Sequence, residues 1–245
     1  GCPPDYFSAT GQRWGNPIYD WDYMLSDGFT FWMSRVKNAS LLYDCIRIDH
    51  FRAFDTYWSI NPACETAVDG VWEIGYGNEF FSKLQSEMPK LKILAEDLGD
   101  LFASVHKLRD KFNLPGMNVI QFSLLNPAAE VKENQIIYTG THDNDTLMGW
   151  LKSLDDETKE ALKIKLKTLK LDGRSIYDKL INYVFSSVDD YAIIPIQDYL
   201  KLGSEYRMNI PGLSGGLNWK FRLVNYDNFE KVIPKIKALN EKYKR

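Results

Sequence analysis

The sequence lacks the features that mark secreted and membrane proteins. Three cysteines occur in 245 residues, at Cys2, Cys45 and Cys64, and they show no paired metal-site spacing. An odd, unpaired set of cysteines favours reduced thiols in a cytosol-like compartment. No apolar run reaches the length needed to span a bilayer, and no signal peptide is visible, although the chain begins at Gly1 rather than Met. We therefore expect a cytoplasmic protein with no membrane partner.

The sequence also lacks an excess of positive charge. Lysine and arginine number 30 against 33 acidic residues, which gives a formal net charge of −3. This balance argues against nucleic acid as a partner and is compatible with an uncharged substrate. Aromatic residues are abundant at 14%, including seven Trp and fourteen Tyr. Aromatic faces stack on sugar rings, but they also fill cores.

Short apolar segments alternate with helical patterns along the chain. We predict five strands, near residues 45, 93, 119, 137 and 193. Helices are predicted near residues 26–43, 79–88, 100–112, 153–170 and 175–188, and a final basic helix is predicted around residues 232–239, with Pro234 leaving its start open. Such alternation indicates an α/β protein with a parallel sheet covered by helices. The length would allow a complete (β/α)8 barrel, but five strands do not close one.

Several local expectations accompany this pattern. The apolar run at 41–46 is predicted to be a buried strand leading to Asp49, with Cys45 as a buried thiol. The Gly- and Pro-rich stretches 1–25 and 53–77 are predicted to be irregular. We expect Asp100 to cap the helix that follows it, and Asp97 to cap the segment after its own strand.

Three carboxylates occur where predicted strands end. Asp49 lies in RIDHFR at 47–52, Glu96 in ILAEDLG at 93–99, and Asp143 in TGTHDND at 139–145. The exit of a barrel strand is where such folds keep their chemistry. Each motif also has a structural explanation, as an ion pair, a loop cap, and a turn or cation loop respectively. Their recurrence at consecutive or near-consecutive strand ends favours one shared site.

The three carboxylates suit retaining glycoside chemistry, which uses two carboxyl groups about 5 to 5.5 Å apart. Asp49 fits the nucleophile, because Arg47 projects to the same side of a strand and keeps it ionised. Glu96 follows apolar residues that favour its protonated form, as a general acid requires. Asp143, with His142, could hold two sugar hydroxyls and strain the ring.

These motifs, with GQRWGNP at 11–17, resemble the 4-α-glucanotransferase family (amylomaltase, or disproportionating enzyme), a relative of the α-amylases. The resemblance covers nearly the whole chain. It implies a (β/α)8 barrel that moves α-1,4-glucan segments through a covalent glycosyl-enzyme. It also implies roles for nine residues. The catalytic residues would be Asp49 as nucleophile, Glu96 as acid/base and Asp143 as transition-state stabiliser; the substrate-binding residues would be Gln12, Trp14, Arg47, His50, His142 and Asn209.

The chain departs from the family pattern in two places. The family's barrel has three further strands and an inserted acceptor-binding region before this point. We therefore expect residues 1–245 to be the C-terminal part of a single catalytic barrel domain, inactive alone. The family's final Gly-Asn-Trp loop appears as residues 214–219, SGGLNW. Trp14 also has a structural alternative, in packing its own loop.

The predicted function is a 4-α-glucanotransferase that uses maltooligosaccharides, or α-1,4-glucans, as donor and acceptor. No cofactor, metal or nucleic acid is expected. If the source is a plant or alga, the compartment would be a plastid. One alternative is an α-amylase-like hydrolase with the same three acids, which calcium dependence would favour. The other is a carbohydrate-binding fragment without turnover, which an Asp49→Asn variant would distinguish.

Overall fold

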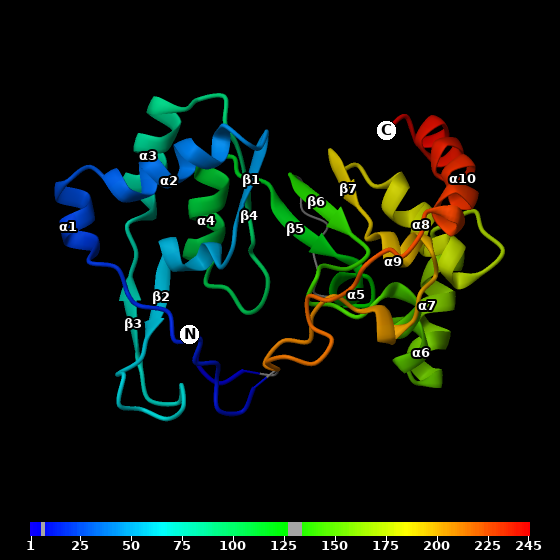
Figure 1. Cartoon of the computed structure of the whole chain (residues 1–245), viewed down its shortest axis with the longest axis horizontal. Helices are drawn as coiled ribbons and strands as arrows, with labels where there is room; N and C mark the ends of the chain where they lie inside the picture. Colours follow the sequence, from blue (N-terminus) through cyan, green and yellow to red (C-terminus); the bar gives the residue numbers. More distant parts are fainter. Residues whose placement is uncertain (6–7, 127–133) are drawn as a thin grey trace. The chain divides into compact units, whose positions relative to one another are not determined.

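The computed structural model describes residues 1–5, 8–126 and 134–245, and it divides into two compact units, residues 1–117 and 118–245 (Figure 1). Residues 6 and 7 of the predicted N-terminal loop lie outside the described residues. Both units combine helices with short strands, so the mixed α/β class is confirmed. In the described ranges, no helix is long and apolar enough to cross a membrane.

The first unit is built on a pair of parallel strands, β1 and β4, joined in register from Cys45↔Lys92 to Ile48↔Ala95. Helices α2, α3 and α4 lie beside this pair (Figure 1). The hydrophobic cluster that joins them contains seven buried aromatic side chains. Phe80 and Phe81 of α3 are fully buried in it, as their helical spacing predicts. The elements of this unit are α1 Trp21–Ser26, α2 Thr30–Ser40, β1 Cys45–Ile48, the 3-10 helix η1 Phe51–Phe54, β2 Thr56–Ser59, β3 Val71–Ile74, α3 Gly77–Glu87, β4 Lys92–Ala95 and α4 Ala103–Lys111.

The strand predicted over 41–46 begins only at Cys45, and Cys45 is exposed rather than buried. Leu41, Leu42 and Tyr43 are also exposed. The backbone N–H groups of Leu42 and Tyr43 donate to Ala39 O and so close the end of α2. Since those donors are committed to the helix end, they are not available to a sheet ladder.

The two stretches predicted to be irregular are partly ordered. Within 53–77, β2 and β3 form an antiparallel pair in which Trp58 faces Trp72, with ring centroids 5.1 Å apart. A cross-strand aromatic pair of this kind stabilises a sheet. Within 1–25, α1 begins after Asp20, whose Oδ1 accepts from Tyr23 N. The prediction missed the β2–β3 pair and α1 because it was based on the Gly and Pro content of these stretches and gave too little weight to their aromatic residues.

Two capping predictions are wrong. Helix α4 begins after Phe102, without a side-chain cap, and the backbone carbonyl of Asp100 instead accepts from Arg52 Nη1 at 2.8 Å. Asp97 does not cap a segment. Its carboxylate is buried against Arg109 of α4 and also accepts from Met117 N.

In the second unit, β5 leads from the first unit into a three-stranded sheet of order β5-β6-β7, in which β6 and β7 are parallel. Helices α6, α7, α8 and α10 contribute to one hydrophobic cluster with Ile137 of β6. The elements are β5 Gly116–Val119, α5 Ile120–Ser123, β6 Gln135–Tyr138, α6 Leu147–Ser153, α7 Asp156–Thr168, α8 Ile176–Ser186, β7 Tyr191–Ile193, α9 Ile196–Tyr199, the 3-10 helix η2 Ser204–Tyr206 and α10 Asp227–Tyr243.

Some predicted boundaries in this unit were wrong. The strand predicted near residue 119 extends no further than Val119, after which the chain forms α5. The helix expected from 153 is α7, which begins at Asp156 because the Asp155 carboxylate accepts from Thr158 N. Leu162 and Leu166 are fully buried, whereas Leu169, which lies just beyond the helix end, is 40% exposed.

Candidate active site

Asp49 and Glu96 lie side by side at the ends of two neighbouring parallel strands. Ile48 of β1 is paired with Ala95 of β4, and each acidic residue directly follows one member of that pair. The backbone N–H of Glu96 donates to Ile48 O at 3.0 Å. Neighbouring strands run about 4.8 Å apart, so the register alone brings these residues close together.

Arg47 and Asp49 form the ion pair that their alternation along a strand predicts. Arg47 Nη1 lies 2.7 Å from Asp49 Oδ1. The Asp49 side chain is 77% exposed, whereas that of Arg47 is 31% exposed. The carboxylate of Asp49 is therefore open to a ligand and has a cation on one side.

Glu96 has a more enclosed carboxylate. Its Oε2 accepts from His50 N at 2.7 Å, and its Oε1 accepts from Leu98 N at 3.1 Å. Burial raises the pKa of Glu96, the negative charge of Asp49 raises it further, and the two backbone hydrogen bonds and Arg47 act against this. The net result is a pKa above the ordinary value, as a proton donor requires.

His50 contributes to the site through both its backbone and its ring. It has a left-handed backbone conformation, with φ of 48°, while its N–H donates to Glu96. Burial, followed by the positive charge of Arg52, lowers the pKa of His50 to about 4. The Trp14 ring meets the imidazole edge-on at 4.8 Å, and Trp14 Nε1 donates to Gln12 Oε1 at 3.1 Å. Gln12, Trp14 and His50 are thus brought together as one group.

The sequence prediction missed a buried ion pair behind Glu96. Arg109 Nη1 lies 2.5 Å from Asp97 Oδ2, and both side chains are almost fully buried. Gly116 leaves room for the pair, because a Cβ there would come within 2.5 Å of Asp97 Oδ2. The available signal was the spacing of Arg109, four residues after Val105 and next to Leu108, which puts it on the buried side of α4.

Asp143 lies in the second unit, on the loop after β6. Asn209 Nδ2 donates to its Oδ1 at 2.6 Å, and His142 Nε2 lies 3.4 Å from its Oδ2. Arg207 Nη2 donates to its backbone carbonyl at 2.6 Å. The His142 ring also packs on Trp219, with centroids 5.2 Å apart. His142, Asp143 and Asn209 therefore form one cluster, to which the structure adds Arg207 and Trp219.

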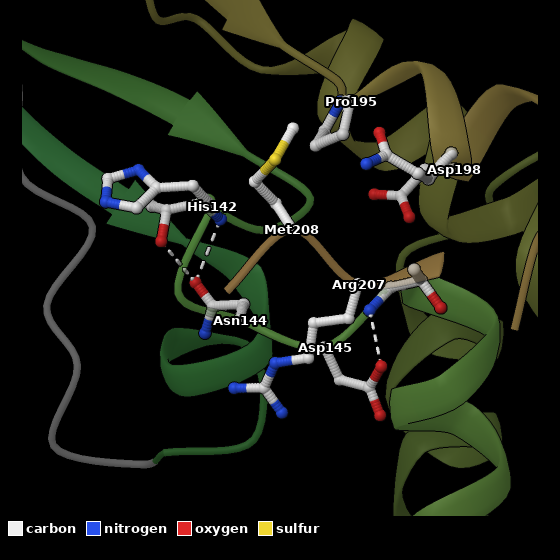
Figure 2. A pocket seen from close by; sticks show the side chains of 10 residues that line it. His142, Asn144, Asp145, Pro195, Asp198, Arg207 and Met208 are labelled. Atoms are coloured by element: carbon white, nitrogen blue, oxygen red, sulfur yellow. Dashed lines mark hydrogen bonds between the residues drawn. The ribbon is translucent and has the colours of Figure 1, made fainter. Parts of the chain in front are cut away.

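A pocket of about 150 Å³ adjoins this cluster (Figure 2). Figure 2 shows His142 and Asp198 on opposite sides of it, with Met208 between them in that view. Asp143 is not among its lining residues, and its half-exposed carboxylate faces Asn209 instead. Among the described residues, no group of three His, Cys, Asp or Glu side chains could hold a metal ion.

Comparison with known proteins places these features in a family. A family model described as 4-alpha-glucanotransferase matches residues 1–226. The 4-alpha-glucanotransferase of Thermus thermophilus is 43% identical over 91% of the chain and 47% of its own length. The chloroplastic/amyloplastic 4-alpha-glucanotransferase of Solanum tuberosum is 41% identical over 98% of the chain and 42% of its own length.

A solved structure agrees with these sequence matches. An amylomaltase from Streptococcus agalactiae, in complex with acarbose, matches with a TM-score of 0.92 and 33% identity, over all of this chain and 50% of that one. The chain thus spans about half the length of the curated relatives it matches. With the matching motifs and strand-end carboxylates, these findings show that the chain belongs to the 4-alpha-glucanotransferase family.

Proposed function

We propose that the protein carrying this chain is a 4-α-glucanotransferase, which moves α-1,4-glucan segments between maltooligosaccharides by a retaining double displacement. The observation that carries the proposal is the position of Asp49 and Glu96, each one residue beyond the paired Ile48 and Ala95 of β1 and β4. One carboxylate is exposed beside a cation, and the other is enclosed with a raised pKa. Two carboxyl groups with opposed environments suit a nucleophile and a proton donor.

In the proposed reaction, Glu96 protonates the glycosidic oxygen while the Asp49 carboxylate attacks the anomeric carbon. The leaving glucan departs with that proton, and the donor remains as a covalent ester on Asp49. Glu96, now ionised, takes the proton from the 4-hydroxyl of an acceptor glucan, which attacks the anomeric carbon and releases Asp49. Transfer exceeds hydrolysis where the acceptor excludes water from the ester.

We assign Asp143 to the transition state, as the group that holds sugar hydroxyls while the ring distorts. Its carboxylate accepts from Asn209, and His142 lies beside it, so the three offer both acceptors and donors to a sugar. Gln12, Trp14, Arg47 and His50 are assigned to substrate binding around the first carboxylate pair. This proposal requires all three acids to meet at one glucosyl ring.

We also propose that the chain is the C-terminal part of one (β/α)8 barrel domain. The parallel pairs β1–β4 and β6–β7 and the likeness to an amylomaltase support this. The remaining strands would come from the half of the relatives' length that the match does not cover. The cytoplasm is the expected compartment, and a plastid is the alternative if the source is a plant or alga, since the Solanum tuberosum relative is chloroplastic/amyloplastic.

Incubation of the full-length protein with maltotriose tests the proposed activity. The expected products are glucose together with a ladder of longer oligomers, because each donated segment is captured by another glucan. Short sugars without a ladder would favour the α-amylase-like hydrolase. Binding without any product would favour a carbohydrate-binding protein.

Substitution of the proposed nucleophile tests the mechanism. Asp49→Asn should lower kcat by about three orders of magnitude or more while sugar binding persists, since the nucleophile acts in the chemical step. Asp44→Asn is the control, because Asp44 is an exposed acid just before β1. Unchanged turnover in Asp49→Asn would reject the assignment.

A further inference from the structure

The loop that carries Asp143 is closed on itself. Asn144 Oδ1 accepts from both the backbone N–H and the hydroxyl of Thr141, each at 2.9 Å. The backbone N–H of Asp143 donates to Thr141 Oγ1 at 3.2 Å. Because the turn 141–144 is internally bonded, it moves as one unit. The position of Asp143 therefore depends on what fixes the backbone just before and just after the turn.

The buried Asp198 carboxylate accepts from Thr139 Oγ1 before the turn and from Leu147 N after it, and the side chain of Gln121 bonds both flanks directly. Gln121 of α5 donates from Nε2 to Thr139 O at 3.0 Å and to Asp145 O at 2.9 Å. Thr139 follows the end of β6, and Asp145 follows the turn. A primary amide has two N–H groups, so these two bonds use its full donor capacity. Gln121 thus bridges the entry and the exit of the loop.

Gly140 makes room for this bridge. A Cβ at Gly140 would lie 2.7 Å from Gln121 Nε2 and 3.2 Å from the Asn144 side chain. The first distance is shorter than real Cβ contacts, so a larger residue would push the amide away from the carbonyl groups. The glycine and the glutamine therefore depend on each other.

We propose that Gln121 is a positioning residue for Asp143. This inference rests on the proposed function, in which Asp143 stabilises the transition state. Asn209 and Arg207 contact Asp143 from the segment after η2, and Gln121 fixes its loop from the side of the sheet. Misplacement of a reacting group by about 1 Å can cost about 100-fold in rate, so a loosened loop should affect turnover more than binding.

The test compares Gln121→Ala, Gln121→Glu and Gly140→Ala in the full-length protein, with maltotriose as substrate. We expect Gln121→Ala to lower kcat about 10- to 100-fold with KM within about threefold of the parent value. Gln121→Glu should lose more, because a carboxylate has no N–H to donate and repels both carbonyl oxygens. Gly140→Ala should also lower kcat, because the added methyl group displaces the Gln121 amide. If the Gln121 variants do not fold, this variant alone tests the proposal.

Gln85→Ala is the matched control. Gln85 Nε2 donates to Phe112 O at 2.8 Å, so this variant loses the same kind of bond in the first unit. It should keep kcat within about twofold. The inference is overturned if folded Gln121→Ala and Gly140→Ala keep kcat, or if Gln85→Ala loses as much. If Asp143→Asn itself keeps kcat, it is the proposed role of Asp143 that fails.

Discussion

His50 has two separate roles at the site, one through its backbone N–H and one through its ring. Its left-handed backbone turns an N–H toward Glu96, while its ring is half-buried beside Arg52 and Trp14. Non-glycine residues adopt this conformation at a cost of about 1–2 kcal/mol, and such strain concentrates at functional sites. Because its pKa is lowered to about 4, the ring stays neutral near neutral pH and adds no positive charge beside Asp49.

The titration of His50 provides the first prediction. Its imidazole should titrate near pH 4 rather than 6.5. Because the folded-state pKa is lowered, the unfolded chain binds the proton first, and the stability due to neutral His50 is lost as pH falls from 6.5 towards 4. NMR titration of the imidazole resonances measures the midpoint, with His50→Gln as the assignment control. A midpoint near 6.5 would contradict the buried, neutral ring.

Arg47 provides a second prediction at the same scale. Its positive charge lowers the pKa of Glu96, so Arg47→Gln should raise that pKa. The alkaline limb of kcat/KM against pH, which reports loss of the proton from the general acid, should therefore move to higher pH. Arg35→Gln, an exposed change on α2, should leave the limb in place. If the alkaline limb stays fixed or moves to lower pH in Arg47→Gln, the positive charge of Arg47 does not control the pKa of the group that this limb reports.

At the scale of elements, one buried ion pair links β4, α4 and β5. Asp97 follows the residue after β4, Arg109 lies on α4, and the N–H of Met117 in β5 donates to the same carboxylate. Glu96 is the immediate neighbour of Asp97. The ion pair therefore anchors the backbone from which the proposed proton donor projects.

Loss of one partner should be costly. Arg109→Met leaves the Asp97 carboxylate buried without its cation, and we expect the free energy of unfolding to fall by about 3–5 kcal/mol. Lys83→Met is the control, because the exposed Lys83–Glu87 pair at 2.6 Å should be worth less than about 1 kcal/mol. Urea unfolding measures both. A loss below about 1 kcal/mol in Arg109→Met would show that the pair does not stabilise the fold.

The elements predicted correctly are those whose hydrophobic pattern is visible within one continuous segment of the sequence. The period of Phe80, Phe81 and Leu84 is visible in eleven residues of α3 and needs no partner. The β2–β3 pair was missed because Trp58 and Trp72 meet only after the intervening loop folds. Asp97 was misread for the same reason, since its partner Arg109 lies on another element.

The site shows the same division. The Arg47–Asp49 ion pair follows from the alternation of side chains along a strand. Asn209 was expected only from the family resemblance, and the structure brings it to Asp143. Gln121 has no sequence signal, because an amide that binds backbone carbonyls looks like any surface glutamine. The combined role of the three acids stays a prediction.

At the scale of the whole molecule, the chain covers about half of its relatives' length. In the described part of the chain, β1 pairs with β4 alone. Leu41, Leu42 and Tyr43 just before β1 are 63–76% exposed. An unpaired strand edge beside exposed apolar residues is a surface that other chain segments commonly cover.

We therefore predict that residues 1–245 expressed alone give no oligomer ladder from maltotriose and bind a dye for apolar surfaces, such as ANS. If the chain is part of a larger barrel, as proposed, catalytic positioning would need the strands and loops contributed by the rest of that barrel. The full-length protein, assayed in parallel, should produce the ladder and bind less dye per mole. A ladder from the isolated chain would show that these residues suffice for transfer.

The register of β1 against β4 limits how far the spacing of Asp49 and Glu96 can change. Asp49 and Glu96 each stand one residue beyond a hydrogen-bonded pair, so their separation is inherited from the peptide backbone. It cannot be adjusted in small steps, since sliding one strand by a single residue would turn its acid to the opposite face. Under the proposed function, new specificities would therefore arise in the connecting loops, which could change the glucans admitted while the distance between the acids stays constant.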